Sequence, residues 1–153
     1  MTEAYNTLYD PASRAEYDEL QHTEREDESS KQDAAYLASE NFRRGQALAA
    51  KGRFKDAVQS MENAIQLDER NARYWLEAGR LLARNPRLRD RAIEHLIEAT
   101  KLDPSLAEGY YELGELYLKI SRRAEAIELF HETLRWEEGH VEARARVREL
   151  GKV

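Results

Sequence analysis

The stretch that decides the fold is residues 107–140, AEGYYELGELYLKISRRAEAIELFHETLRWEEGH. Apolar residues recur there at steps of three and four, first around Gly114 and then around Ala126. This spacing is typical of amphipathic helices, which bury one face and leave the other in water. The segment therefore predicts two helices joined by a turn.

The same pattern occurs twice more, with a period of 34 to 35 residues. The other copies are residues 38–71, ASENFRRGQALAAKGRFKDAVQSMENAIQLDERN, and residues 72–106, ARYWLEAGRLLARNPRLRDRAIEHLIEATKLDPSL. Two positions repeat in every copy, a glycine in the first helix and an alanine in the second: Gly45, Gly79, Gly114, and Ala57, Ala92, Ala126. The change in their spacing puts one extra residue in the second copy, and we expect it in the turn at residues 85–89.

The recurring glycines need a physical reason, because glycine costs roughly 1 kcal/mol in a helix interior. We expect each one to allow close approach of the second helix, with the alanine on the other side. The second helices also carry core stripes at three- and four-residue steps: Val58, Met61, Ile65; Ile93, Leu96, Ile97; Ile127, Phe130, Leu134.

Helix ends are marked by local signals. Asn71 is suited to cap a helix, Gly52 to end one in the left-handed conformation, and Ser105 with Glu108 forms a capping-box sequence. The sequence predicts helices over residues 33–51, 54–67, 72–84, 88–101, 106–119, 122–136 and 140–150. The last helix is half apolar and fits a solvating cap.

These copies resemble tetratricopeptide repeats, a 34-residue helical pattern of Trp, Leu-Gly, Tyr, Ala, Phe, Ala and Pro. The residues that carry the resemblance are Trp75, Leu113, Gly114, Tyr117, Ala126, Phe130, Ala99 and Pro104. The resemblance implies an all-α, right-handed superhelix, or α-solenoid. Its expected parts are three repeats over residues 33–137 (about 38–71, 72–106 and 107–140) and a capping helix over 138–153.

The negative charge of the chain lies in its first 32 residues. The net charge is −6, and residues 1–32 hold nine acidic and three basic residues, so that 3 − 9 = −6. The remaining residues hold 21 of each sign. Residues 21–32, QHTEREDESSKQ, lack apolar side chains and predict a solvated linker or an exposed helix extension, with a boundary near residues 29–31.

The opening residues resemble the last part of a J-domain, the co-chaperone module of seventy-kilodalton heat-shock chaperones. The matching residues are Ala4, Tyr5, Leu8, Asp10, Pro11, Arg14, Tyr17 and Asp18. Asp10 before Pro11 also suits a helix start. No His-Pro-Asp loop is present, so residues 1–28 are interpreted as a J-domain remnant with an acidic linker, and a fuller protein is expected to carry the J-domain upstream. Apolar residues of this segment are expected to dock on the first repeat or on a second copy: Tyr5, Leu8, Tyr9, Tyr17 and Leu20.

The tetratricopeptide resemblance places a binding groove on the first helices, where members of the family hold an extended peptide or a partner helix. The residues at groove positions are Phe42, Arg43, Gln46, Arg73, Leu76, Glu77, Arg80, Arg84, Glu108, Tyr111, Glu112, Glu115 and Lys119. We expect arginines at the centre, acids toward one end, and apolar anchors at Phe42, Leu76 and Tyr111.

Some members of the family hold the acidic tails of heat-shock chaperones with Lys, Asn, Asn, Lys and Arg. The matching residues here are Phe42, Gln46, Glu77, Glu108 and Glu112. Three carboxylates at these positions would repel an acidic tail, so this clamp is not expected.

An arginine cluster surrounds the turn of the second copy: Arg80, Arg84, Arg87, Arg89 and Arg91. Guanidinium groups pair with phosphate or carboxylate, but the neutral charge of residues 33–153 does not favour nucleic acid. Solvation of the helix surface is the plainer interpretation. A further alternative is a salt-sensitive contact with the acidic residues 24–28, within or between molecules.

Catalysis is not indicated. The chain has no cysteine, no glycine-rich phosphate loop, and histidines that lack metal-ligand spacing. No cofactor, metal site or membrane-spanning segment is expected, and a cytoplasmic location is the default.

The sequence thus predicts a non-catalytic scaffold that binds a protein or peptide partner. Two alternatives stay open. One is the repeat portion of a J-domain co-chaperone, and the other is a homo-oligomerisation module assembled through the N-terminal segment.

Overall fold

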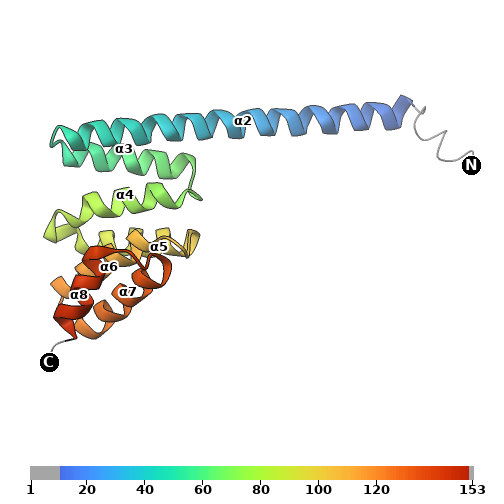
Figure 1. Ribbon diagram of the computed structural model, residues 1–153. Helices are drawn as coiled ribbons and strands as arrows, with labels where there is room; N and C mark the ends of the chain where they lie inside the picture. Colours follow the sequence, from blue (N-terminus) through green and yellow to red (C-terminus); the bar gives the residue numbers. More distant parts are fainter. Residues whose placement is uncertain (1–10, 152–153) are drawn as a thin grey trace, which may run out of the picture. The chain divides into compact units, whose positions relative to one another are not determined.

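The structure is a computed structural model that describes residues 11–151 (Figure 1). All regular elements in this range are helical: α2 (Pro11–Ala50), α3 (Phe54–Leu67), α4 (Ala72–Ala83), the 3₁₀ helix η1 (Pro86–Leu88), α5 (Arg89–Leu102), α6 (Ala107–Lys119), α7 (Arg123–Trp136) and α8 (Val141–Leu150). From α3 onward, the predicted helix bounds agree with the observed ones to within one residue. The chain divides into two units, residues 1–37 and 38–153.

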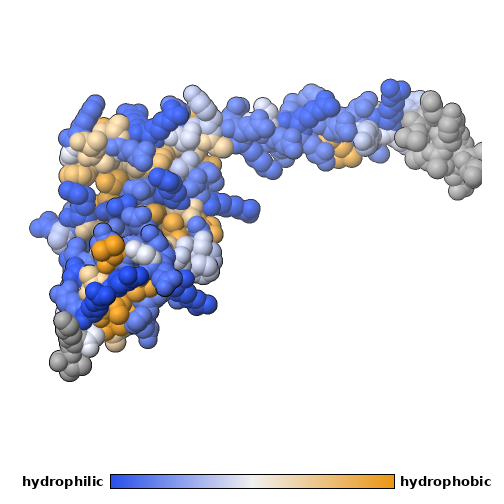
Figure 2. Space-filling model, in the orientation of Figure 1, coloured by the Kyte–Doolittle hydropathy of each residue, from blue (hydrophilic) through white to orange (hydrophobic). Residues whose placement is uncertain are grey.

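In the first unit, the described residues 11–37 all belong to α2. Helix therefore runs through the proposed boundary at residues 29–31, and the exposed helix extension is the alternative that holds. The local cause is composition, since Glu, Gln, Lys and Arg favour helix. Short-range contacts add to it: the Gln21 amide donates to the Tyr17 hydroxyl at 3.1 Å, and Thr23 donates to the Glu19 carbonyl at 2.7 Å. The surface of this stretch is almost entirely hydrophilic (Figure 2).

In the second unit, three helix–turn–helix hairpins stack one after another. The hairpins are the end of α2 with α3, α4 with α5, and α6 with α7, and each glycine allows the close approach that the sequence predicts. A Cβ atom at Gly45 would lie 2.9 Å from Met61 Cε, one at Gly79 2.8 Å from Leu96 Cγ, and one at Gly114 2.6 Å from Phe130 Cε1.

The alanines opposite these glycines are fully buried, as expected. The tightest steric contact of each glycine is with the residue that lies four positions after the alanine, which is Met61, Leu96 or Phe130. These three side chains are at most 1% exposed and form the centres of the three hairpins. A glycine thus faces a large side chain in each repeat, and the alanine beside it leaves room for both helices.

The turns within the hairpins differ from one another. Gly52 in the first and Ser121 in the third adopt left-handed φ angles of +76° and +64°. The second turn holds the extra residue as predicted, and there Asn85 accepts a hydrogen bond from the Arg87 amide at 3.0 Å and η1 follows.

The predicted caps are confirmed at Asn71, whose side chain accepts from the Arg73 amide at 3.1 Å, but not at Ser105. There α6 begins at Ala107, with Leu106 as the N-cap residue, so the predicted capping box does not form. The Ser105 amide and hydroxyl instead donate to Asp103, at 3.0 and 2.6 Å. The Asp103 carboxylate therefore accepts the hydrogen bonds of the segment that joins α5 to α6.

Candidate functional site

The candidate site is the surface formed by the first helices of the repeats, and contacts between successive helices build it. At the start of the row, the ring centroids of Phe42 on α2 and Tyr74 on α4 lie 4.9 Å apart. Tyr74 is buried and Phe42 is half-buried, so Phe42 keeps part of its ring accessible. Leu76, by contrast, is 4% exposed and belongs to the core. It offers too little surface to be the anchor that was expected.

Arg80 on α4 is the electrostatic centre of this surface. Its guanidinium lies 3.5 Å from Glu77, 3.1 Å from Glu108 and 3.3 Å from Glu112, so it joins α4 to α6. One cation therefore faces three carboxylates, and this cluster carries an excess of two negative charges. The arginines do lie on the central first helix, α4, and the contacts add that glutamates of α6 approach Arg80.

Glu112 is the most perturbed carboxyl of this cluster. Burial, the largest cause, raises its pKa; Glu108, Glu115 and Glu77 raise it further, whereas Arg80 lowers it. The charged form of Glu112 is thus held at a cost in the folded protein. A cation that entered the site would reduce this cost.

A hollow of about 390 Å³ lies beside the Arg80 cluster, between α4 and α6. The residues that line it are Glu77, Arg80, Leu81, Ala83, Arg84, Glu112 and Lys119. Carboxylates lie on one side of it, while Arg84 and Lys119 are exposed at the ends of their helices. The hollow is therefore bipolar, and it is wide enough to admit a ligand side chain.

The capping helix closes the other end of the row. Arg146 on α8 donates two hydrogen bonds to Glu115, from Nε at 2.6 Å and from Nη2 at 2.9 Å. His140, which caps α8 by accepting from the Ala143 amide at 3.2 Å, lies 4.7 Å from the Tyr111 ring. Glu115 and Tyr111 are thus partly occupied by groups of this chain.

Arg146 and His140 contact this surface although neither is among the predicted groove residues. A signal was present, because adding the period of 34 residues to Glu112 gives 112 + 34 = 146. Arg146 is therefore the next groove position after Arg43, Glu77 and Glu112. Treating the cap as the first helix of a further copy would have found it.

The remaining predicted groove residues lie on the same helices without joining the Arg80 cluster. Arg43 forms an ion pair with Glu40 at 3.0 Å, whereas Gln46 and Arg73 are exposed. In the N-terminal segment, Tyr17 and Leu20 are 61% and 63% exposed. The other three residues of the proposed docking segment, Tyr5, Leu8 and Tyr9, lie outside the described residues.

Other kinds of site were sought in residues 11–151. No cluster of three or more histidine, cysteine or carboxylate side chains is placed there to hold a metal ion. Nor does this range contain a helix long and apolar enough to cross a lipid bilayer.

Comparisons with known proteins agree with this geometry. Tetratricopeptide-repeat families match residues 42–89, 90–121 and 107–140; these matches do not include the J-domain-like opening segment. A repeat-containing thioredoxin of Arabidopsis thaliana, TTL4, is 30% identical over 82 residues, which are 54% of this chain and 12% of that protein.

Solved structures show the same fold. The Arabidopsis OM64 repeat domain matches with a TM-score of 0.74 and 20% identity, over 78% of this chain and 98% of that one. The first repeat domain of RPAP3 (Spaghetti), bound to the HSP90 peptide SRMEEVD, matches with a TM-score of 0.72 and 17% identity, over 77% and 95%. With its three stacked hairpins and their tight glycines, the chain is a tetratricopeptide-repeat protein.

Proposed function

We propose that this chain is a cytoplasmic, non-catalytic interaction module that binds an extended peptide of a partner protein along its first helices. The observation that carries the proposal is the Arg80 cluster beside an open hollow. A similar fold holds a peptide in the RPAP3 structure. Phe42 and Tyr111, which are both half-buried, are the available aromatic contacts on either side of the cluster.

The charge of the cluster sets the expected ligand. Three carboxylates around one guanidinium leave two negative charges uncompensated, and burial already disfavours the ionised form of Glu112. A lysine or arginine of the peptide relieves both conditions, whereas a glutamate adds a fourth carboxylate. We therefore expect a basic segment in preference to an acidic tail.

Two labelled peptides test this preference by fluorescence polarisation. One is SRMEEVD, the HSP90 peptide bound to RPAP3, and the other is SRMKKVD, in which lysines replace its two glutamates. We expect the lysine peptide to bind at least tenfold more tightly at low salt. Replacing Glu112 with lysine adds two positive charges, which removes the excess negative charge of the cluster, and is expected to abolish this difference.

A matched control carries the same charge change away from the cluster. Glu128 is exposed on α7, the second helix of the third repeat, so Glu128→Lys should leave the preference intact. Tighter binding of SRMEEVD, or the same loss of preference in the Glu128→Lys variant, would contradict the proposal.

A second candidate function rests on the J-domain-like opening residues. In this proposal the chain is the repeat portion of a co-chaperone, and the repeats hold the partner while a J-domain recruits the chaperone. Of the matching residues, Pro11, Arg14, Tyr17 and Asp18 lie in the described part of α2. Sequencing the gene upstream tests this directly, since the proposal requires a His-Pro-Asp loop in the same reading frame.

The third candidate is self-association through the N-terminal segment, which the exposure of Tyr17 and Leu20 favours. Light-scattering mass is the measurement, at low and high salt. If the segment assembles copies, a Tyr17→Glu, Leu20→Glu double variant should be monomeric where the wild type is dimeric, and Ser30→Glu should behave as wild type. A wild-type chain that is monomeric at every concentration removes this candidate.

A further inference from the structure

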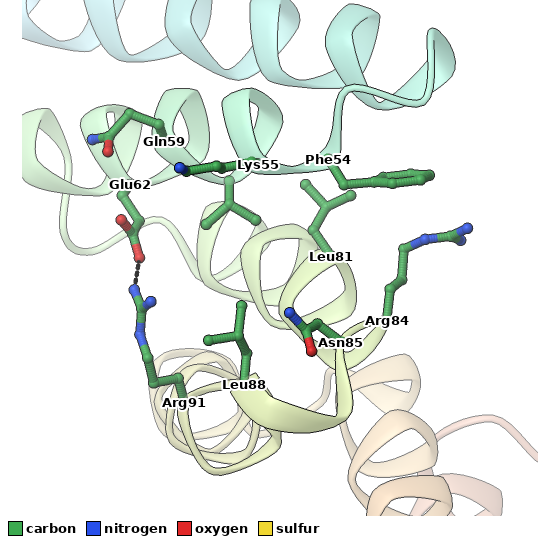
Figure 3. A pocket seen from close by; sticks show the side chains of 10 residues that line it. Phe54, Lys55, Gln59, Glu62, Leu81, Arg84, Asn85, Leu88 and Arg91 are labelled. Carbon is green, nitrogen blue, oxygen red and sulfur yellow. Dashed lines mark hydrogen bonds and ion pairs between the residues drawn. The ribbon is translucent and has the colours of Figure 1, made fainter.

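A second hollow lies between α3, the end of α4 and η1 (Figure 3), and it shares Leu81 and Arg84 with the hollow beside the Arg80 cluster. Its volume is about 580 Å³. Val58, Leu81 and Leu88 form its apolar lining, and each is half-buried. The arrangement leaves apolar surface accessible beside α3, the second helix of the first repeat.

The longer turn of the second repeat contributes to this hollow through Asn85 and Leu88. In the other two repeats a single left-handed residue turns the chain. In the second, Asn85 and Pro86 start η1, and η1 ends at Leu88, which lies beside Leu81 in the hollow (Figure 3). The longer turn therefore adds one apolar side chain to this surface.

Cations surround the apolar lining. Lys55, Arg84 and Arg91 line the hollow together with one carboxylate, that of Glu62. Arg91 forms an ion pair with Glu62 (Figure 3), which compensates one positive charge. Among the residues that the structure describes, Lys55 and Arg84 have no ion-pair partner. The hollow therefore keeps two uncompensated positive charges.

Arg84 is held in place by an aromatic ring. Its guanidinium carbon lies 4.0 Å from the centroid of Phe54, within the range of a cation–π contact. A guanidinium fixed in this way loses less rotamer entropy when it binds a carboxylate, and its planar fork suits bidentate pairing. The arginine is thus prepared for an anionic group of a ligand.

We propose that this hollow is a second docking site, which takes a partner-protein segment with one apolar side chain between carboxylates. The apolar side chain occupies the space among Val58, Leu81 and Leu88, and the carboxylates pair with Arg84 and Lys55. The apolar lining and Glu62 favour such a segment over nucleic acid, whose phosphates would meet only the cations. Charge complementarity selects this partner, and burial of its apolar side chain supplies affinity.

The test uses the full chain and a labelled peptide, Glu-Glu-Leu-Glu-Glu, with Lys-Lys-Leu-Lys-Lys and Glu-Glu-Ser-Glu-Glu as comparisons. We expect each comparison peptide to bind at least tenfold more weakly. Arg84→Glu and Lys55→Glu should each weaken binding of the first peptide at least fivefold. Arg148→Glu, an exposed position on α8, is the matched control and should leave binding unchanged.

The position of binding is read from methyl NMR signals. Shifts of Val58 and Leu88, which line this hollow but not the one beside Arg80, support the proposal, while shifts confined to the first-helix surface around Arg80 overturn it. Equal binding of the lysine or serine peptide also overturns it. So does tighter, Arg84-dependent binding of oligothymidine, which would assign the surface to nucleic acid, or an Arg84-dependent dimer, which would assign it to a second copy.

Discussion

The first and third repeats place the same glycine against different partners. In the first, a Cβ at Gly45 would meet the flexible end of Met61 at 2.9 Å and, less closely, the Ala57 carbonyl oxygen at 3.2 Å. In the third, a Cβ at Gly114 would lie within 3.0 Å of three atoms of the Phe130 ring. Methionine adapts its rotamers to a neighbour, whereas a buried phenylalanine ring has no such freedom. Two equivalent positions in one repeat pattern thus differ in how much change they tolerate.

The largest expected effect comes from Gly114→Ala. Overpacking against Phe130 costs about 1–3 kcal/mol, which exceeds the helix-propensity gain of roughly 1 kcal/mol. Gly45→Ala meets a side chain that moves aside, so its propensity gain offsets most of the strain. Urea unfolding should therefore show a clear loss of stability for Gly114→Ala and a change close to zero for Gly45→Ala.

A double variant identifies the cause of that loss. If the phenylalanine ring is responsible, Gly114→Ala should cost less in a Phe130→Leu background than in the wild type. Equal costs in the two backgrounds, or equal losses at Gly45 and Gly114, would refute the role given to ring rigidity.

The turns offer the next comparison, with a smaller expected effect. Both Gly52 and Ser121 adopt left-handed φ angles, but only serine has a Cβ that makes this conformation costly. Ser121→Gly should raise the free energy of unfolding by about 0.5–1 kcal/mol, and Gly52→Ala should lower it by about 1 kcal/mol.

Thermal unfolding measures both changes, and Gly139→Ala is the control because a Cβ there meets no atom within 4 Å and no left-handed φ is involved. Loss of stability in Ser121→Gly would show that the serine side chain makes a stabilising contact that outweighs its backbone strain.

The smallest expected effect concerns the junctions between repeats. The first helices of repeats one and two meet through aromatic rings, Phe42 and Tyr74, whereas those of repeats two and three meet through Arg80, Glu108 and Glu112. Ionisation of Glu112 opposes folding, because its pKa is raised in the folded state. This cost is present above the folded pKa and disappears below the unfolded pKa, near 4.3.

We therefore expect Glu112→Gln to be slightly more stable than the wild type at pH 7, with the difference vanishing as the pH falls to about 4. Denaturant titrations at several pH values provide the measurement. Phe42→Leu, at the aromatic junction, should show a difference from the wild type that does not change with pH. A Glu112→Gln variant that loses stability at pH 7 would mean that its pairing with Arg80 outweighs burial.

Much of the fold was predictable because residues that recur with the repeat period occupy equivalent positions in the core. Gly45, Gly79 and Gly114 predicted the close helix contacts, and the shift in spacing located the extra residue at the second turn. The capping box at Ser105 was not realised, since Asp103 competes for the same backbone groups. Helix capping depends on which nearby side chain accepts the hydrogen bond of a given backbone amide, and composition alone does not determine this.

The site was less predictable than the fold. The sequence predicted that Arg80, Glu108 and Glu112 lie on first helices. The repeat period does not show which side chains meet across helices, so the contacts of Arg80 with Glu108 and Glu112 of the next repeat were not predicted. Leu76 was predicted to line the groove, but its side chain is buried in the core. The apolar hollow at Leu88 depends on how the longer turn packs, which spacing does not reveal.

Because each helix from α3 to α8 packs mainly on the helices next to it in sequence, a pulling force along this part of the chain would load its junctions in series. Under such a load the ionic junction between repeats two and three has to open through the two ion pairs that Arg80 makes with α6, to Glu108 and Glu112. Salt would then soften this junction more than the aromatic one before it. The junctions therefore differ in mechanical stiffness, and ionic strength sets the stiffness of the one between repeats two and three.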